Sequence, residues 1–128
     1  MAGERILIVD DNAANLKLAR ILLQGAGYEV RTASDAEEAM RVLAAFGPRL
    51  ILMDIQLPGV DGLELTRRLK ASPATSDIVV LALTAYAMKG DEEKARRAGC
   101  DGYVAKPVDV EFLPAVVAHH LEPRSARP

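Results

Sequence analysis

The stretch RILIVDD at residues 5–11 decides the fold class. Its apolar run from Ile6 to Val9 is rich in β-branched residues and does not alternate with polar ones, which is typical of a strand buried on both faces of a parallel sheet. Two aspartates follow directly, and Asn12 is placed to cap a helix whose apolar residues recur at helical spacing as far as Leu23. The segment therefore predicts a buried strand that leads straight into a helix.

The same strand-and-helix unit recurs four more times along the chain. Further strands are predicted at residues 29–32, 50–53, 78–83 and 103–105. Ser34 and Glu37 form an S-x-x-E capping box for the second helix, which we expect to bury Met40. Strict alternation with short connections predicts a doubly wound α/β sandwich, with a flavodoxin-like five-stranded parallel sheet in the order 2-1-3-4-5 and helices on both faces.

Length predicts a single domain. The chain has 128 residues, and we expect the domain to cover residues 1–121, with 122–128 as a flexible tail and no second domain after it. Pro114 lies near the start of the last helix, where it removes a backbone donor, so we expect a kink or a late start there. His119 and His120 are adjacent on that helix and point apart, which favours a solvated helix end over a shared metal site.

Composition excludes several classes of function. The formal net charge of −2 leaves no excess of basic residues for binding a nucleic acid. No apolar run is long enough to span a bilayer, and the N-terminus lacks the features of a signal peptide. Cys100 is the single cysteine, so it predicts neither a disulfide framework nor a zinc site and is expected to pack at a turn without a role. A cytoplasmic location fits these observations.

Three aspartates form the candidate site. Asp10 and Asp11 follow the first strand and Asp54 follows the third, and the predicted strand order places these two strand ends side by side. Each aspartate alone is more simply a helix cap or a turn residue. Together they repel one another unless a cation lies between them, and hard oxygen ligands favour Mg²⁺ over zinc. Thr84 and Lys106 lie at the same rim and suit a phosphoryl group.

Four segments at the predicted strand ends resemble the signature blocks of response-regulator receiver domains. They are Val9-Asp10-Asp11, residues 53–62 (MDIQLPGVDG), Leu83-Thr84-Ala85 and Ala105-Lys106-Pro107. The resemblance extends from Arg5 to about Leu121. The segment at residues 84–91 also resembles that of DivK-type single-domain regulators. The expected absence of an output domain fits the same type.

The resemblance implies a phosphorylation-activated switch of a two-component system or phosphorelay. Asp54 would accept a phosphoryl group from a phosphohistidine of a sensor histidine kinase or a histidine phosphotransfer protein. Lys106 and Thr84 would contact the phosphoryl oxygens, and the metal would be Mg²⁺, with Mn²⁺ able to substitute. The implied metal ligands are Asp10, Asp11, Asp54 and the backbone carbonyl of Gln56. The protein would not be an enzyme beyond Mg²⁺-dependent self-phosphorylation and slow autodephosphorylation.

The resemblance also implies how the signal is read. Thr84 would move toward the phosphate and leave room for Tyr103 to turn inward, and the peptide bond before Pro107 would be cis. Downstream proteins would bind the face made by the fourth helix, fifth strand and fifth helix, with the protein a monomer or weak dimer. Tyr103 is equally explained as an aromatic residue that packs on a strand.

Three other functions remain as alternatives. A phosphatase would use Asp54 as nucleophile, but Gln56 stands where such enzymes place a second acid. A flavin-binding protein would need a phosphate-binding loop after the first strand, where this chain has two acids. A phosphorylation-independent interaction module would be expected to lack part of the acidic site, and all of it is present.

Overall fold

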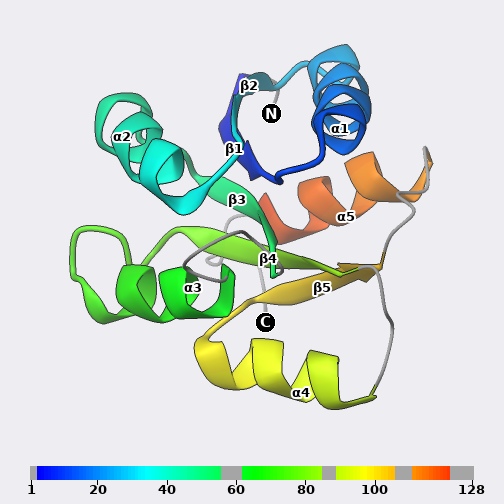
Figure 1. The fold of residues 1–128 in the computed structure, drawn as a ribbon. Coiled ribbons are helices and arrows are strands. Elements are labelled where there is room, and N and C mark those ends of the chain that lie inside the picture. Colours follow the sequence, from blue (N-terminus) through cyan, green and yellow to red (C-terminus); the bar gives the residue numbers. More distant parts are fainter. Residues whose placement is uncertain (1–2, 56–61, 85–88, 106–110, 122–128) are drawn as a thin grey trace, which may run out of the picture.

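The computed structural model describes residues 3–55, 62–84, 89–105 and 111–121, and these form a sheet between two layers of helices (Figure 1). The five strands are parallel and follow the order β2-β1-β3-β4-β5. Their bounds are β1 Arg5–Val9, β2 Glu29–Ala33, β3 Leu50–Asp54, β4 Val79–Thr84 and β5 Gly102–Ala105. The predicted fold class and strand order are confirmed.

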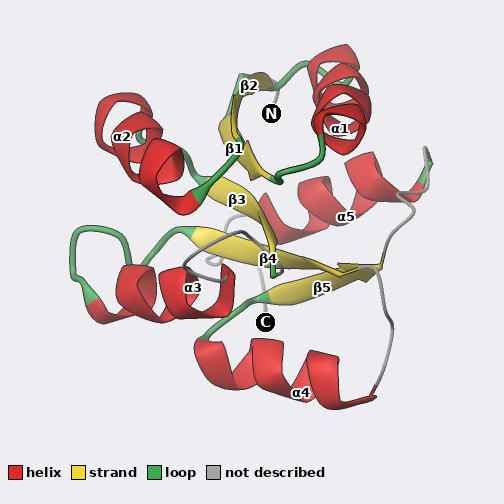
Figure 2. Ribbon diagram, viewed as in Figure 1, coloured by secondary structure: helices red, strands yellow, loops and turns green. Residues whose placement is uncertain are grey.

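Five helices cover the two faces of the sheet (Figure 2). Helices α1 and α5 pack on one face, and α2, α3 and α4 pack on the other. Their bounds are α1 Ala13–Gly25, α2 Ala36–Phe46, α3 Gly62–Ala71, α4 Lys89–Ala98 and α5 Phe112–Leu121. Within the described ranges, no helix combines the length and the apolar character that crossing a membrane requires.

The central strands explain the unbroken apolar runs in the sequence. In β1, Ile6 and Ile8 point toward α1 and α5, whereas Leu7 and Val9 point toward α2 and α3, and all four side chains are fully buried. Alternate residues of a strand face opposite sides of the sheet, so a strand covered on both sides must be apolar at every position. Burial of each such side chain stabilises the fold by roughly 1.5–3 kcal/mol.

Strand register brings the carboxyl ends of the strands to one edge of the sheet. Val9 lies opposite Met53 across β1 and β3, and Asp54 lies opposite Leu83 across β3 and β4. Residues that follow β1 and β3 therefore emerge next to each other, as the doubly wound topology requires.

The predicted cap of α2 is wrong by one residue. Asp35, not Ser34, is the N-cap, and its side chain accepts a hydrogen bond from the backbone N–H of Glu38 at 2.7 Å. Glu38 completes the box because its Oε1 accepts from the backbone N–H of Ser34 at 2.7 Å. Met40 is 45% exposed instead of buried.

The last helix starts late, as predicted from its proline. Helix α5 begins at Phe112, so Pro114 falls in the first turn, where a missing N–H breaks no intrahelical hydrogen bond. His119 is exposed, but His120 is half-buried: its ring covers Gly102 of β5, and its Nδ1 lies 3.0 Å from the carbonyl oxygen of Val116. The expectation that both histidines are solvated is therefore wrong for His120.

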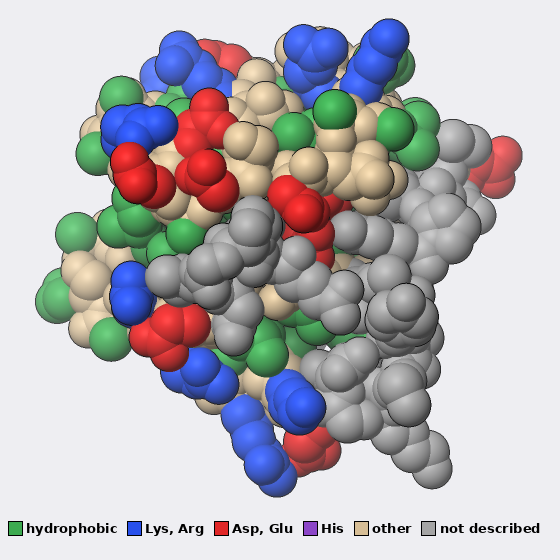
Figure 3. Space-filling view, in the orientation of Figure 1, with side chains coloured by type: hydrophobic (Ala, Val, Ile, Leu, Met, Phe, Trp, Pro, Cys, Tyr) green, Lys and Arg blue, Asp and Glu red, His purple; other side chains and the backbone are tan. Residues whose placement is uncertain are grey.

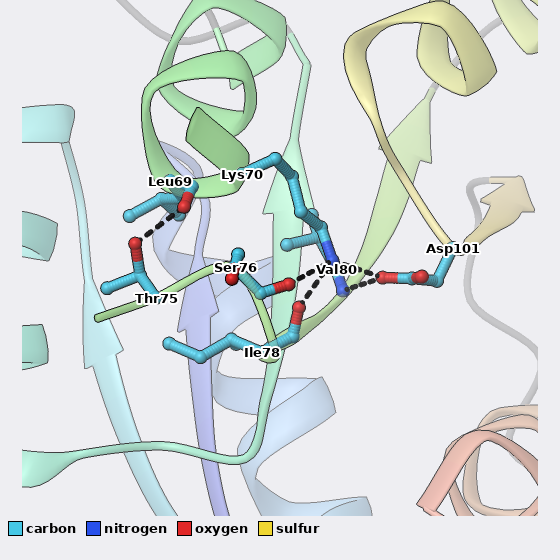
Figure 4. Close-up of polar contacts among 7 residues, drawn as sticks. All are labelled: Leu69, Lys70, Thr75, Ser76, Ile78, Val80 and Asp101. Atoms are coloured by element: carbon cyan, nitrogen blue, oxygen red, sulfur yellow. Dashed lines mark hydrogen bonds and ion pairs between the residues drawn. The ribbon is translucent and has the colours of Figure 1, made fainter. Parts of the chain in front are cut away.

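Lys70 joins three segments at the amino-terminal edge of the sheet (Figure 4). Its Nζ donates to the carbonyl oxygen of Ile78 at 2.7 Å, to that of Ser76 at 3.4 Å and to Oδ2 of Asp101 at 2.8 Å. Asp101 also accepts from the backbone N–H of Val80 at 2.9 Å. The end of α3, the start of β4 and the turn before β5 are thus tied together at the edge opposite the candidate site.

Candidate functional site

Three carboxylates meet at the carboxyl ends of β1 and β3. Asp10 and Asp11 follow β1, Asp54 is the last residue of β3, and one carboxylate oxygen from each lies within 4.8 Å of the others. Asp10 is 0% exposed, Asp54 is 3% exposed and Asp11 is exposed. The structure therefore brings together the three acids that the sequence predicted.

Asp10 is held by the turn from β1 into α1. Its backbone N–H donates to the carbonyl oxygen of Ala33 at 3.1 Å, which continues the pairing of β1 with β2. Its Oδ1 accepts from the backbone N–H of Asn12 at 2.9 Å. Asn12 in turn caps α1, because its Oδ1 accepts from the backbone N–H groups of Ala14 and Asn15. The helix cap and the orientation of the Asp10 carboxylate thus depend on the same turn.

Asp54 is held by the central position of β3 in the sheet. It is paired with Leu83, and the next residue, Ile55, donates its N–H to the carbonyl oxygen of Leu83 at 3.1 Å. The chain returns to this point at Gly62, whose N–H donates to the carbonyl oxygen of Ile55 at 3.3 Å. The Asp54 backbone is therefore fixed from both sides, by β4 and by the start of α3.

The donor set fits a hard divalent cation. All three ligating groups are carboxylates, and neither histidine nor cysteine belongs to the cluster. The three carboxylate oxygens lie within 4.8 Å of one another, which is near enough for the acids to draw together around one ion. Two buried carboxylates so close to a third one favour a bound cation, because a cation offsets their mutual repulsion.

The exposed acid keeps the cluster open to solvent. Acidic side chains lie near the middle of the molecular face shown in Figure 3. Because Asp11 is exposed while Asp10 and Asp54 are buried, an ion would reach the cluster past Asp11.

Several predicted site residues fall outside the described part of the chain. These are the predicted metal ligand Gln56, the predicted phosphoryl contact Lys106 and the predicted switch residue Pro107. For Thr84 the structure gives the backbone position: it ends β4 and pairs with Ala105, the residue before Lys106. Their roles remain predictions.

Tyr103 packs on the side of β5 that faces α4. It is half-buried and contacts the apolar cluster of Ile55, Ala82 and Ala95. It also lines a pocket of about 300 Å³ between α4 and β5. This placement is compatible with simple strand packing and with an inward turn of the ring.

Two residues near Asp54 were given no role from the sequence. Gly62 is buried against the end of β3, and Thr66 is a fully buried polar residue whose Oγ1 donates to the carbonyl oxygen of Gly62 at 2.8 Å. The signal in the sequence was a glycine at the start of a helix, followed four residues later by a threonine between Leu65 and Leu69 on an otherwise buried face.

Comparisons with known proteins agree on one family. The family model described as the response regulator receiver domain matches residues 6–118. The polar-differentiation response regulator DivK of Brucella anthropi is 48% identical over 116 residues, which are 91% of this chain and 94% of that protein. DivK of Brucella abortus gives the same identity and coverage.

Solved structures show the same architecture. The chemotaxis response regulator CheY4 of Vibrio cholerae superposes with a TM-score of 0.88 at 26% identity, covering 94% of this chain and 100% of that one. A two-component response regulator from Clostridium difficile gives a TM-score of 0.84 at 26% identity, covering 91% and 93% of the two chains.

Proposed function

The chain belongs to the response regulator receiver domain family, and we propose that Asp54 is the residue on which it is phosphorylated. The protein is a phosphorylation-activated switch of two-component signalling, of the DivK type over the length compared. The observation that carries the assignment to Asp54 is its burial at the end of β3, within 4.8 Å of Asp10 and Asp11.

The chemistry is transfer of a phosphoryl group to a carboxylate. An oxygen of Asp54 attacks phosphorus in line with the bond to the donor imidazole, the new O–P bond forms, and the N–P bond breaks. The bonding electrons stay on the imidazole nitrogen, which takes a proton from water. The attacking carboxylate oxygen carries no proton that must be removed, so no general base is required.

The remaining site residues stabilise charge during the transfer. Asp10, Asp11, Asp54 and the backbone carbonyl of Gln56 would hold Mg²⁺, which neutralises negative charge on the phosphoryl oxygens when bound, and Mn²⁺ would substitute for it. A further cation at that rim would come from Lys106, and a hydroxyl donor from Thr84, whose backbone ends β4. Positioning and charge neutralisation account for most of the catalysis in such transfers.

The output would be a change of surface on α4, β5 and α5. We infer that Thr84 turns toward the phosphoryl group and that Tyr103 then moves into the space beside it, with Pro107 in the adjoining connection. The position of Tyr103 supports this inference, because it lies on the α4 side of β5 and contacts the cluster that contains Ala82 of β4.

The partners follow from the chemistry. The donor would be a sensor histidine kinase or a histidine phosphotransfer protein, and the targets would be proteins, not nucleic acids or membranes. Family members are signalling proteins, and we propose that this one has no activity beyond self-phosphorylation and slow autodephosphorylation. We place it in the cytoplasm as a monomer or weak dimer, with residues 1–121 as the receiver domain.

The assignment is tested with phosphoramidate, a small donor with the P–N bond of phosphohistidine. After incubation with Mg²⁺, borohydride reduction converts an aspartyl phosphate to homoserine, which peptide mass spectrometry locates. We expect homoserine at position 54 in the wild type, none in Asp54→Asn, and unchanged labelling in Asp77→Asn, whose carboxylate is exposed near the opposite edge of the sheet.

Other outcomes would favour the alternatives. Homoserine at a different position, or at none, would overturn the assignment to Asp54. Steady hydrolysis of a phosphomonoester would favour a phosphatase, and Mg²⁺-independent partner binding that survives Asp54→Ala would favour a phosphorylation-independent module.

A further inference from the structure

Gly62, the first residue of α3, packs directly against the backbone that carries Asp54. A Cβ atom at this position would overlap the carbonyl oxygen of Asp54 and would lie 2.9 Å from its carbonyl carbon and 2.9 Å from Cα of Ile55. Real Cβ atoms do not approach other heavy atoms so closely, and backbone atoms cannot rotate away as a flexible side chain can. Only glycine permits this approach.

Thr66 ties the first turn of α3 to the same point. It is 0% exposed, and its Oγ1 donates to the carbonyl oxygen of Gly62 at 2.8 Å. A hydroxyl buried this completely is costly unless it is hydrogen bonded, so this bond constrains where the first turn of α3 lies.

The packing of α3 prevents Gly62 from moving away from β3. Leu65 and Leu69 are each 2% exposed and pack with Met53 and Val80 in the core on this face of the sheet. Moving the helix away to make room for a side chain at position 62 would open this core. The alternative is a shift of the β3 end, which would move the carboxylate of Asp54 relative to Asp10 and Asp11.

We propose that Gly62 and Thr66 are positioning residues that hold Asp54 in place for metal binding beside Asp10 and Asp11. The proposal rests on the proposed function, because it takes Mg²⁺ as the ligand of these three acids. A carboxylate displaced by part of an ångström still lies near the ion but no longer completes an octahedral set, for which Mg²⁺ is demanding.

The test measures the dissociation constant of Mg²⁺ from backbone amide NMR shifts, without any phosphoryl donor. We expect Gly62→Ala to weaken Mg²⁺ binding by about tenfold or more, since disturbing the groups that orient metal ligands typically costs about 10- to 100-fold in metal affinity. The matched control is Gly25→Ala at the end of α1, where an added Cβ meets no atom within 4 Å, and which should bind as the wild type does.

A conservative pair separates positioning from general destabilisation. Thr66→Val keeps the shape of the side chain but loses the hydroxyl, and should weaken Mg²⁺ binding. Thr66→Ser keeps the hydroxyl donor and should bind Mg²⁺ with the affinity of the wild type. Urea unfolding of each variant reports stability independently, and a variant that is only less stable keeps the wild-type dissociation constant once folded.

The outcomes are distinguishable. If the wild type itself shows no Mg²⁺-dependent shifts near Asp54, the proposed metal site fails. If the wild type binds and a folded Gly62→Ala binds equally well, the positioning role fails. Should Gly62→Ala not fold, the Thr66 pair decides, and equal Mg²⁺ affinity in Thr66→Val and Thr66→Ser would overturn the proposal.

Discussion

At the scale of residues, the site depends on a contrast between buried and exposed acids. Asp10 and Asp54 are buried, and the exposed Asp11 lies above them. Carboxylates gathered this closely repel one another unless a cation lies among them, so we expect the cluster to cost stability when no cation is bound. Such an arrangement is expected where a charged group serves function and not packing.

Cys100 illustrates the opposite case, a reactive group made inert by its surroundings. Burial raises the pKa of the Cys100 thiol and nearby Asp101 raises it further, although the hydrogen bond with Thr66 and the Lys70 ammonium act in the lowering direction. We predict that iodoacetamide alkylates Cys100 more slowly at pH 7.5 than it alkylates the same protein in urea, because less thiolate is present in the folded state.

The pH dependence has a definite sign. Because the folded pKa is raised, the thiol contributes stability that is complete below the unfolded pKa and is lost as pH rises through it toward the folded value. The alkylation rate of the folded protein should therefore begin to rise at a higher pH than that of the unfolded protein. Coincident pH–rate profiles, measured by intact mass, would contradict the account.

At the scale of elements, Lys70 and Asp101 connect α3 to the turn before β5. The two residues are 31 positions apart in sequence, and their side chains are only 19% and 26% exposed. Unlike a surface ion pair, this contact also satisfies backbone groups of Ile78 and Val80 at the start of β4. It fixes the amino-terminal edge of the sheet while the opposite edge carries the chemistry.

Lys70→Met is predicted to lower the free energy of unfolding by about 2 kcal/mol, because it leaves the Asp101 carboxylate and the Ile78 carbonyl without their ammonium donor. Urea denaturation provides the measurement. The matched control is Arg41→Met, which removes an exposed pair with Glu37 at 3.0 Å and should cost less than about 0.5 kcal/mol. An equal loss of unfolding free energy in the two variants would show that the Lys70 contact stabilises the fold no more than an exposed ion pair does.

The elements themselves could be predicted from the sequence because their signals are local. Buried parallel strands are apolar at every position, and their alternation with helices predicts a doubly wound sheet, for which 2-1-3-4-5 is a common strand order. The cap of α2 was missed by one residue because Ser34 and Asp35 both suit an N-cap and each has a glutamate three residues later. Local patterns cannot choose between two such registers.

The contacts that position the site were beyond sequence analysis. Gly62 belongs to the segment 53–62 that resembles a receiver signature block, but only the three-dimensional approach of α3 to β3 shows that it packs against the Asp54 backbone. His120 likewise covers Gly102 because α5 packs against β5, which periodicity does not reveal. By contrast, the clustering of the three acids at one edge of the sheet could be predicted, because it depends only on which strands are neighbours.

At the scale of the whole molecule, the acidic cluster links metal binding to stability. A ligand that binds only the folded state raises the free energy of unfolding. Well above the dissociation constant, the increase is proportional to the logarithm of the ratio of ligand concentration to dissociation constant. Mg²⁺ held by the three carboxylates would also remove their repulsion, which the metal-free fold must tolerate.

Mg²⁺ at about one hundred times its dissociation constant should stabilise the protein by about 2.7 kcal/mol, and a chelator should reverse the effect. Thermal unfolding in MgCl₂ and in NaCl of equal ionic strength provides the comparison, and Asp11→Asn should lose most of the difference. The same melting temperature in both salts would argue against a specific ion at this cluster.

Asp54 is proposed to accept the phosphoryl group with the help of a divalent cation. The most direct test is intact mass spectrometry after incubation with acetyl phosphate, with and without Mg²⁺, on the wild type and on Asp54→Asn. We predict a single phosphoryl adduct that forms only with Mg²⁺ and only in the wild type. An adduct of equal yield in Asp54→Asn, or no adduct in the wild type under any condition, would contradict the account.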